Sequence, residues 1–113
     1  MTSRIEHAGD VSVLRPSGRL DSITAASIEK EIAAVSTHSP RVVLDLSELD
    51  YLSSAGVRVI VISAKRLKQR AGTFVLCNPQ PVVRRVLELS GLFGTLTIAS
   101  SLAQAMSSAG GTA

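Results

Sequence analysis

The chain has 113 residues, of which 45% are hydrophobic, and a formal net charge of +3. This length predicts one domain with a substantial core and leaves no room for a second. With no Trp, one Tyr and two Phe, the core must be aliphatic, and the aromatic platforms that hold single-stranded nucleic acid are missing. We interpret the basic cluster of Lys65, Arg66, Lys68 and Arg70 as the solvated face of a helix, so neither a nucleic-acid partner nor membrane insertion is predicted.

The cysteine count and the first residues bear on the cellular compartment. The single cysteine, Cys77, cannot form an internal disulfide and lies in an apolar run, where a free cysteine behaves as a small buried side chain. Residues 1–7 lack the apolar stretch of a signal peptide, and no run approaches the roughly 20 apolar residues of a membrane span. We therefore expect a cytoplasmic protein.

The first half of the chain predicts a hairpin, a helix and a buried strand. Alternating residues at 3–7 and 11–15 flank a turn that contains a glycine, which is typical of a β-hairpin. Apolar residues at helical spacing predict a helix over about 24–35. The nearly continuous apolar run at 41–46 predicts a strand that is buried on both faces of a parallel sheet.

The second half repeats the alternation of helix and strand. A helix is expected over about 55–70, because its apolar stripe has helical spacing and its last turn is basic. A strand over 73–77 follows, and then a helix that starts within Asn78-Pro79-Gln80-Pro81 and ends at Leu89. A short strand at 96–99 and a short helix at 101–106 complete the pattern.

This alternation predicts a single α/β domain. Its sheet is mixed but mostly parallel, with about five strands, an N-terminal hairpin and about four helices. Functional loops of such sheets lie beyond the carboxyl ends of the strands, which is where residues 49–56 must lie. The loop at 18–23 joins them if the second hairpin strand runs parallel to the next strand, and Asp21 and Ser54 are then neighbours. Residues 107–113 are small and polar, which predicts a flexible tail.

Residue types that could support catalysis are present but lack a recognisable arrangement. His7 and His38 have no nucleophile or metal partner at a known spacing, and we interpret both as solvated surface side chains. Asp45, Glu48 and Asp50 are clustered but fit a strand end and turn positions. No glycine-rich phosphate loop is present. The sequence therefore predicts no catalytic residue, no metal, no cofactor and no enzymatic activity.

Two serines, Ser53 and Ser54, lie at the predicted start of the second helix. The first turn of a helix has backbone N–H groups without intrahelical partners and a partial positive charge, which stabilise an oxygen or a phosphate there. Physical reasoning alone favours a simple helix cap, which contributes about 1 kcal/mol. A phosphorylated serine is the alternative, and it would add up to about two negative charges to the surface.

Four short motifs occur in order on the predicted elements. They are G-x-L-D at 18–21, D-L-S-x-L at 45–49, S-S-A-G-V at 53–57 and S-G-L-F at 90–93. In this order they resemble the STAS domain family of bacterial anti-sigma-factor antagonists. The resemblance covers nearly the whole chain and implies a STAS domain over residues 2–106.

The resemblance also implies a modification site. In that family, the serine or threonine two residues before the loop glycine is phosphorylated by a partner kinase, which implies Ser54, with Ser53 as the alternative. Many family members have Asp before the phosphorylated residue and Ser after it, whereas this chain has Ser53 and Ala55 there.

The implied mechanism is partner switching. The unphosphorylated protein would bind an anti-sigma factor that has serine kinase activity, and so release the sigma factor. Phosphorylation of Ser54 would end that binding, and a PP2C-type phosphatase would restore it. The helix that follows is expected to turn Val57, Ile60, Val61, Ala64 and Leu67 inward and Val59 and Ile62 outward. The residues predicted to contact the partner are Asp21, Ser22, Leu52, Ser53, Ala55, Gly56, Arg58, Val59 and Ile62.

Two other functions stay open on the sequence. In one, the chain is a scaffold subunit of a transporter or a larger signalling complex, and Ser54 is only a cap. In the other, it is a small ligand-binding or enzymatic α/β domain, which the missing catalytic groups disfavour.

Overall fold

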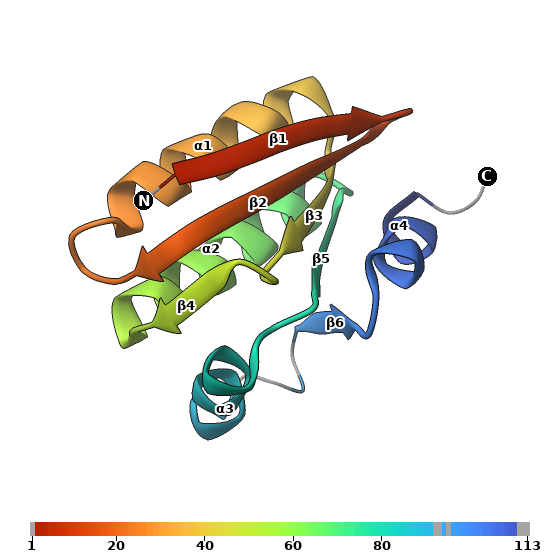
Figure 1. Ribbon diagram of the computed structural model, residues 1–113. Helices are drawn as coiled ribbons and strands as arrows, with labels where there is room; N and C mark the ends of the chain where they lie inside the picture. The colour runs from red at the N-terminus through yellow and green to blue at the C-terminus, as the bar shows by residue number, and fades with distance from the viewer. Residues whose placement is uncertain (1, 92–93, 95, 111–113) are drawn as a thin grey trace.

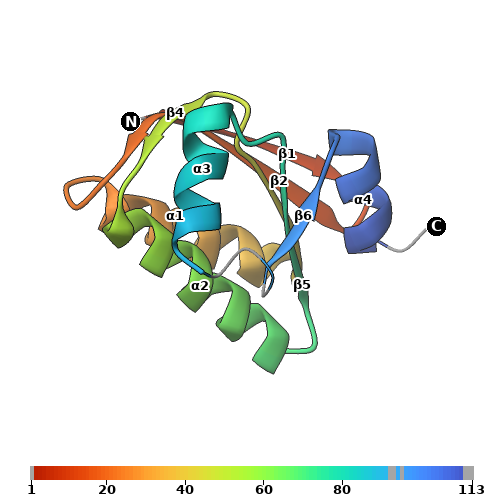
Figure 2. The same ribbon diagram turned by 90° about the horizontal axis from the view of Figure 1, so that it is seen from below.

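The structure, a computed structural model, describes residues 2–91, 94 and 96–110. Its strands are β1 (Thr2–Ala8), β2 (Val11–Leu20), β3 (Arg41–Asp45), β4 (Leu49–Leu52), β5 (Thr73–Cys77) and β6 (Thr97–Ala99). Its helices are α1 (Ala25–His38), α2 (Ser54–Gln69), α3 (Pro81–Leu89) and α4 (Leu102–Gly110). Helices α1 and α2 lie side by side on one face of the sheet, and α4 lies on the other (Figures 1 and 2).

The long strand β2 organises the sheet, whose order is β1-β2-β3-β5-β6. Its first half pairs in parallel with β3, while its last residues pair in parallel with β4, after a shift in register between Gly18 and Arg19. The sequence prediction missed β4, because the segment is short and its ends, Leu49 and Leu52, are buried while the middle is exposed. The described sheet thus has six strands instead of about five. The predicted antiparallel hairpin of β1 and β2 is confirmed.

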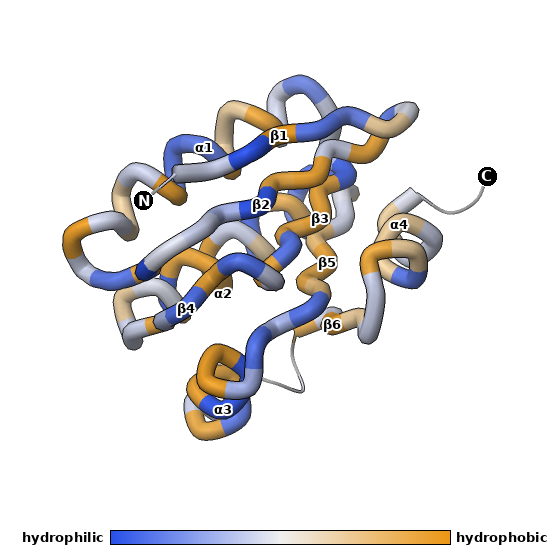
Figure 3. The backbone as a smooth tube through the Cα atoms, in the orientation of Figure 1, coloured by the Kyte–Doolittle hydropathy of each residue, from blue (hydrophilic) through white to orange (hydrophobic). Residues whose placement is uncertain are grey.

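Residues that alternate along the central strands belong to two hydrophobic cores, one on each face of the sheet. The larger core lies under α1 and α2 and includes Leu14, Leu44 and Leu76. The smaller core lies under α4 and contains Val43 and Cys77 from the sheet. Figure 3 shows this apolar centre in β3 and β5, in contrast to the hydrophilic residues along β1. Each central strand is therefore covered on both faces, as the apolar run at 41–46 predicts.

Helix α2 buries a wider arc than its sequence pattern indicates. It packs against β4 and β5 and also against α1. As a result Val59, which was predicted to face outward, is only 4% exposed and belongs to the larger core. Ile62 is half-buried. The prediction of an exposed apolar pair on α2 is therefore wrong for Val59.

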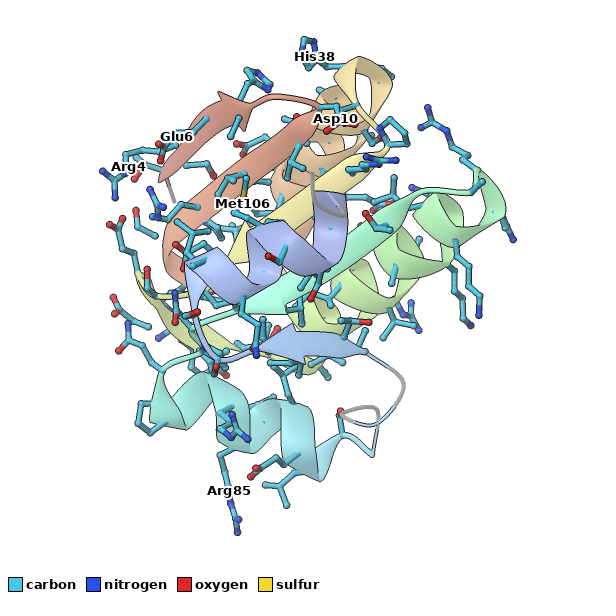
Figure 4. The ribbon with its side chains drawn as sticks, turned by 90° about the vertical axis from the view of Figure 1, so that its right-hand side faces the viewer. Arg4, Glu6, Asp10, His38, Arg85 and Met106 are labelled. Carbon is cyan, nitrogen blue, oxygen red and sulfur yellow. The ribbon has the colours of Figure 1, made fainter. Side chains whose placement is uncertain are left out.

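Two helices are longer than the sequence predicts. Helix α1 continues to His38 and α4 continues to Gly110. In α4 the extra turn is held in place by Ala109, which is buried with Ala105 against the sheet. Figure 4 shows α4, the helix that contains Met106, in front of the strands. Residues 107–110, expected to be part of a tail, are helical; residues 111–113 lie outside the described residues.

A buried ion pair joins the strands next to the β3–β4 turn. Asp45 Oδ2 accepts a hydrogen bond from Arg15 Nε at 2.8 Å, and Asp45 Oδ1 accepts one from the Ser47 N–H at 3.0 Å. Arg15 also donates to Glu6 at 2.7 Å, so the pair connects β1, β2 and β3. Burial alone would raise the pKa of Asp45, but the hydrogen bonds from Arg15 and Ser47 outweigh it and hold the pKa below its ordinary value.

We expect Asp45→Asn to destabilise the fold by about 2 kcal/mol at neutral pH, because it removes a charge-assisted hydrogen bond between the half-buried Arg15 and the buried Asp45. The folded-state pKa of Asp45 is depressed, so its contribution is present above the unfolded value of about 3.9 and is lost as the pH falls through the folded value. Urea unfolding at pH 7 and pH 3 measures this, with the exposed Asp50→Asn as the control. If the free energies of unfolding of wild type and Asp45→Asn differed by the same amount at both pH values, the proposed contribution of the ionised Asp45 would be contradicted.

The thiol of Cys77 lies in the same region. It is fully buried, and this burial, followed by the nearby carboxylate of Asp45, raises its pKa to about 12. Because the thiolate is the reactive form of cysteine, this side chain is chemically inert near neutral pH. The interpretation of Cys77 as a small buried side chain is confirmed.

Candidate functional site

The candidate site lies where β2 and β4 end side by side. Leu20 and Leu52 are paired in the parallel register, and both are buried. Directly after them, the Ser53 N–H donates to the Leu20 carbonyl at 2.9 Å. The loop after β2 and the start of α2 are therefore joined at this edge, as expected for the carboxyl ends of parallel strands.

Ser53 is the cap of α2. Its backbone is extended and its hydroxyl accepts a hydrogen bond from the Gly56 N–H at 3.3 Å. This bond satisfies one of the N–H groups that the first helical turn leaves without partners. Ser53 is also half-buried, so its hydroxyl is both occupied and partly covered.

Ser54 differs from Ser53 in both respects. It is the first residue of α2 and is exposed. Within the described part of the chain, its hydroxyl takes part in none of the hydrogen bonds. Of the two serines, Ser54 therefore offers the accessible nucleophilic oxygen.

Gly56 lets α2 approach the strand ends closely. A Cβ atom at this position would lie 2.6 Å from Leu52 Cδ1, 2.8 Å from Leu20 Cγ and 2.9 Å from the Leu20 carbonyl oxygen. Distances this short are steric clashes, and one of them involves the backbone. The glycine is therefore required by the contact that brings Ser53 and Ser54 to the end of β2.

Asp21 lies beside this edge, but its carboxylate serves its own turn. Oδ1 accepts hydrogen bonds from the N–H groups of Ile23 at 2.9 Å and Thr24 at 3.2 Å. The bond from Thr24 is foremost in holding the pKa of Asp21 below its ordinary value, and Arg19 acts in the same direction. The pairing of Leu20 with Leu52 places Asp21 next to Ser53 along the backbone, and Ser54, the predicted neighbour of Asp21, is the following residue.

The residues predicted to contact a partner divide by exposure. Ser22 and Arg58 are exposed, while Ala55 and Ile62 are half-buried. Leu52, Gly56 and Val59 are instead buried, so they are not part of the exposed surface at this edge. Leu52 and Val59 belong to the larger core, and the space around Gly56 is filled by the two leucines.

Two exposed apolar side chains near the site escaped the sequence analysis. Ile23, next to Asp21, is 87% exposed. Tyr51 on β4 is 36% exposed, and the guanidinium carbon of Arg19 lies 4.0 Å from the centre of its ring. The available signal was an isoleucine in an otherwise polar loop, D-S-I-T, where no helical or strand pattern requires an apolar residue.

The two histidines lie away from the site. The rings of His7 and His38 contact each other, with centroids 4.3 Å apart, and His7 Nδ1 is 3.0 Å from Ser12 Oγ. His38 ends α1, at the end of the molecule far from α3 in Figure 4. Among the residues that the structure describes, no group of three or more His, Cys, Asp or Glu side chains could hold a metal ion. No helix in the described part of the chain is long and apolar enough to cross a membrane.

Comparison with known proteins decides the family. A family model described as the STAS domain matches residues 2–105, nearly the whole chain. The chain belongs to the STAS domain family. Of the motifs that carried the resemblance, the first three lie in described segments, and Leu92 and Phe93 of the fourth lie outside the described residues.

Relatives of this STAS domain are anti-sigma factor antagonists. BtrV of Bordetella bronchiseptica, described as a candidate anti-sigma factor antagonist, is 47% identical over 85 residues, which cover 74% of this chain and 73% of BtrV. The crystal structure of an anti-sigma factor antagonist from Mycobacterium paratuberculosis has a TM-score of 0.86 and 30% identity, over 96% of this chain and 92% of that one. SpoIIAA in its unphosphorylated form has a TM-score of 0.81 at 24% identity, covers 99% of both chains, and shares the fold.

Proposed function

We propose that this STAS domain is an anti-sigma factor antagonist controlled by phosphorylation of Ser54. Unphosphorylated, it binds an anti-sigma factor that is also a serine kinase, and so frees the sigma factor. Phosphorylated, it no longer binds. One observation carries the choice of residue. The hydroxyl of Ser53 caps α2, whereas Ser54 is the exposed first residue of this helix.

The departure of this chain from the family pattern is compatible with the proposal. Many family members have Asp where this chain has Ser53, and both residues are strong N-caps because each places an oxygen near the N–H groups of the first turn. Ser53 accepts such a hydrogen bond from Gly56. The serine thus fulfils the structural task of the aspartate and leaves Ser54 free for modification.

The exposed residues around Ser54 define the proposed docking surface. It comprises Ser22 and Ile23 from the loop after β2, Tyr51 from β4, and Ser54 and Arg58 from α2. Ile23 and Tyr51 supply apolar contact area, and Arg58 supplies a positive charge one helical turn after Ser54. A phosphate on Ser54 must be desolvated when a partner covers this surface, which opposes binding.

The protein is then a substrate and a ligand, and it performs no catalysis of its own. A PP2C-type phosphatase would remove the phosphate and restore binding. An antagonist acts where its anti-sigma factor acts, so we place this function in the cytoplasm. The proposal involves no cofactor.

Phosphate mapping tests the choice of residue directly. The protein is incubated with ATP and a serine kinase of the anti-sigma factor class, and the modified residue is located by mass spectrometry. We expect phosphate on Ser54 in the wild type and in Ser53→Asp, and none in Ser54→Ala. Phosphate on Ser53, or unchanged labelling of Ser54→Ala, would overturn the assignment.

A further inference from the structure

The outer edge of β1 is open. β1 is the first strand in the order of the sheet, and within the described part of the chain β2 is its only strand neighbour. All of its residues are exposed except Ser3, which is half-buried. The backbone N–H and C=O groups along an open edge can pair with a further strand. β1 therefore offers a pairing surface along its whole length.

Arg4 and Glu6 give this edge two charges of opposite sign. They lie on the face of the sheet that carries the smaller core, because Glu6 is paired with Val13 in the register. Figure 4 shows both side chains on the outer side of β1. Arg4 forms an ion pair with Glu48, and Glu6 forms one with Arg15, but the side chains of Arg4 and Glu6 are still 62% and 64% exposed. Both charges can therefore accept a second partner.

The strand that complements these charges is β1 of a second copy. In antiparallel pairing around a two-fold axis at Ile5, Arg4 of each copy lies opposite Glu6 of the other. The same register pairs every residue of β1, from Thr2 opposite Ala8 to Ile5 opposite Ile5. An axis at Arg4 or at Glu6 would instead place like charges directly opposite each other, which is unfavourable. The charges thus select the register that also pairs the whole strand.

The other face of the same edge supports this register. Ile5 is 46% exposed and is paired with Leu14 of the larger core, so it lies on the face that α1 covers and would contact Ile5 of the second copy. Among the described residues, Ser3 Oγ is the one buried side-chain nitrogen or oxygen without a hydrogen-bond partner. In this register Ser3 lies opposite His7 of the second copy, whose ring nitrogens can form a hydrogen bond with a hydroxyl.

The fold leaves room for the second copy. Neighbouring strands are about 4.8 Å apart, so the β2 strands of the two copies would be separated by about 14 Å, with both β1 strands between them. Helix α1 packs over β2 and β3. Because packed helices need only about 8–10 Å between their axes, the two α1 helices fit on the same face of a joint sheet.

We propose that the chain forms a dimer through antiparallel pairing of β1 with β1 of a second copy, centred on Ile5. Each copy keeps its docking surface, because that surface lies at the carboxyl ends of β2 and β4 and not along the open edge of β1. The antiparallel pairing places the two docking surfaces at opposite ends of the joint sheet. The contact involves one strand of each copy, so the dimer is small in area and exchanges with the monomer.

Sedimentation velocity of the unphosphorylated protein, from micromolar to millimolar concentration, tests the proposal. We expect the average mass to rise with concentration from that of the monomer toward that of the dimer. Over the same range, the NMR amide signals of Arg4, Ile5 and Glu6 should shift, whereas those of α3 should not. A monomer at every concentration, or shifts confined to another surface, would refute the dimer.

Charge reversal tests the register. Arg4→Glu places carboxylates opposite each other, and Glu6→Arg does the same with guanidinium groups, so each variant alone should self-associate at least about tenfold more weakly than the wild type. An equimolar mixture of the two should form a heterodimer, because every carboxylate of one variant then lies opposite a guanidinium of the other. Wild-type association of either single variant, or no heterodimer in the mixture, would overturn the proposal.

Two further variants serve as controls. Arg85→Glu reverses an exposed charge on α3, far from β1 in Figure 4, and should dimerise like the wild type. A loss as large as that of Arg4→Glu would show that net charge, and not the edge of β1, controls association. Ser54→Ala should also dimerise like the wild type, so failure of the phosphorylation hypothesis leaves this result unaffected.

Discussion

Replacement of Ser54 by aspartate is expected to weaken binding to the anti-sigma factor by roughly 10- to 100-fold, or about 1.4–2.8 kcal/mol. The physical reason is desolvation: a carboxylate at an exposed position of the docking surface loses its water when the partner covers it. A phosphate carries about two charges and should have a larger effect. Ser54→Ala adds no charge and should bind like the wild type. Isothermal titration calorimetry with the purified partner measures all three forms.

Ser53→Asp is the matched control for this experiment. It introduces the same carboxylate one residue earlier, where aspartate is a good helix cap and the side chain is half-buried against the first turn of α2. We expect its affinity to stay near that of the wild type. If Ser53→Asp weakened binding as much as Ser54→Asp, net charge and not the position of Ser54 would control the interaction.

Substitution of Gly56 is expected to have the largest effect on stability. A Cβ atom at this position would clash with Leu52 and with both the side chain and the carbonyl of Leu20. Gly56→Val should therefore destabilise the protein by roughly 3 kcal/mol. Gly56→Ala should cost less, roughly 1 kcal/mol, because the better helix propensity of alanine offsets part of the clash. Urea unfolding measures both variants.

Gly94 provides the matched control for Gly56. A Cβ atom at Gly94 would meet no atom of the described residues within 4 Å, and the φ angle of Gly94 is not one that favours glycine. Gly94→Ala should change stability by less than about 0.5 kcal/mol. A similar loss in Gly94→Ala and Gly56→Ala would show that close packing at the start of α2 is not the cause.

Most of the fold could be predicted from local sequence patterns. The apolar runs of β3 and β5, the helical spacing of α2 and the alternation along the hairpin all have a direct structural cause. β4 could not be predicted, because its pairing with the end of β2 depends on the register shift after Gly18. Val59 was misplaced for a similar reason: a helical wheel assumes one buried side, whereas α2 packs against both the sheet and α1.

The candidate site could be predicted as a segment from physical reasoning, and as a single residue only through the family resemblance. The helix start gives both serines the same chemistry, whereas counting back from Gly56 in the family motif implies Ser54. The structure adds a physical difference between them, the hydrogen bond from the Gly56 N–H to the Ser53 hydroxyl. The exposed Ile23 was missed because no periodic pattern extends into its loop, and exposure there depends on the course of the backbone.

The division of tasks between the two serines has a kinetic consequence for the proposed function. The hydroxyl of Ser53 keeps the first turn of α2 in place, while that of Ser54 lies outside this bond. A phosphate can therefore be attached or removed without unwinding the helix. On this account the cap of α2 need not break when Ser54 is modified, so the enzymes that act on Ser54 set the time scale of the response.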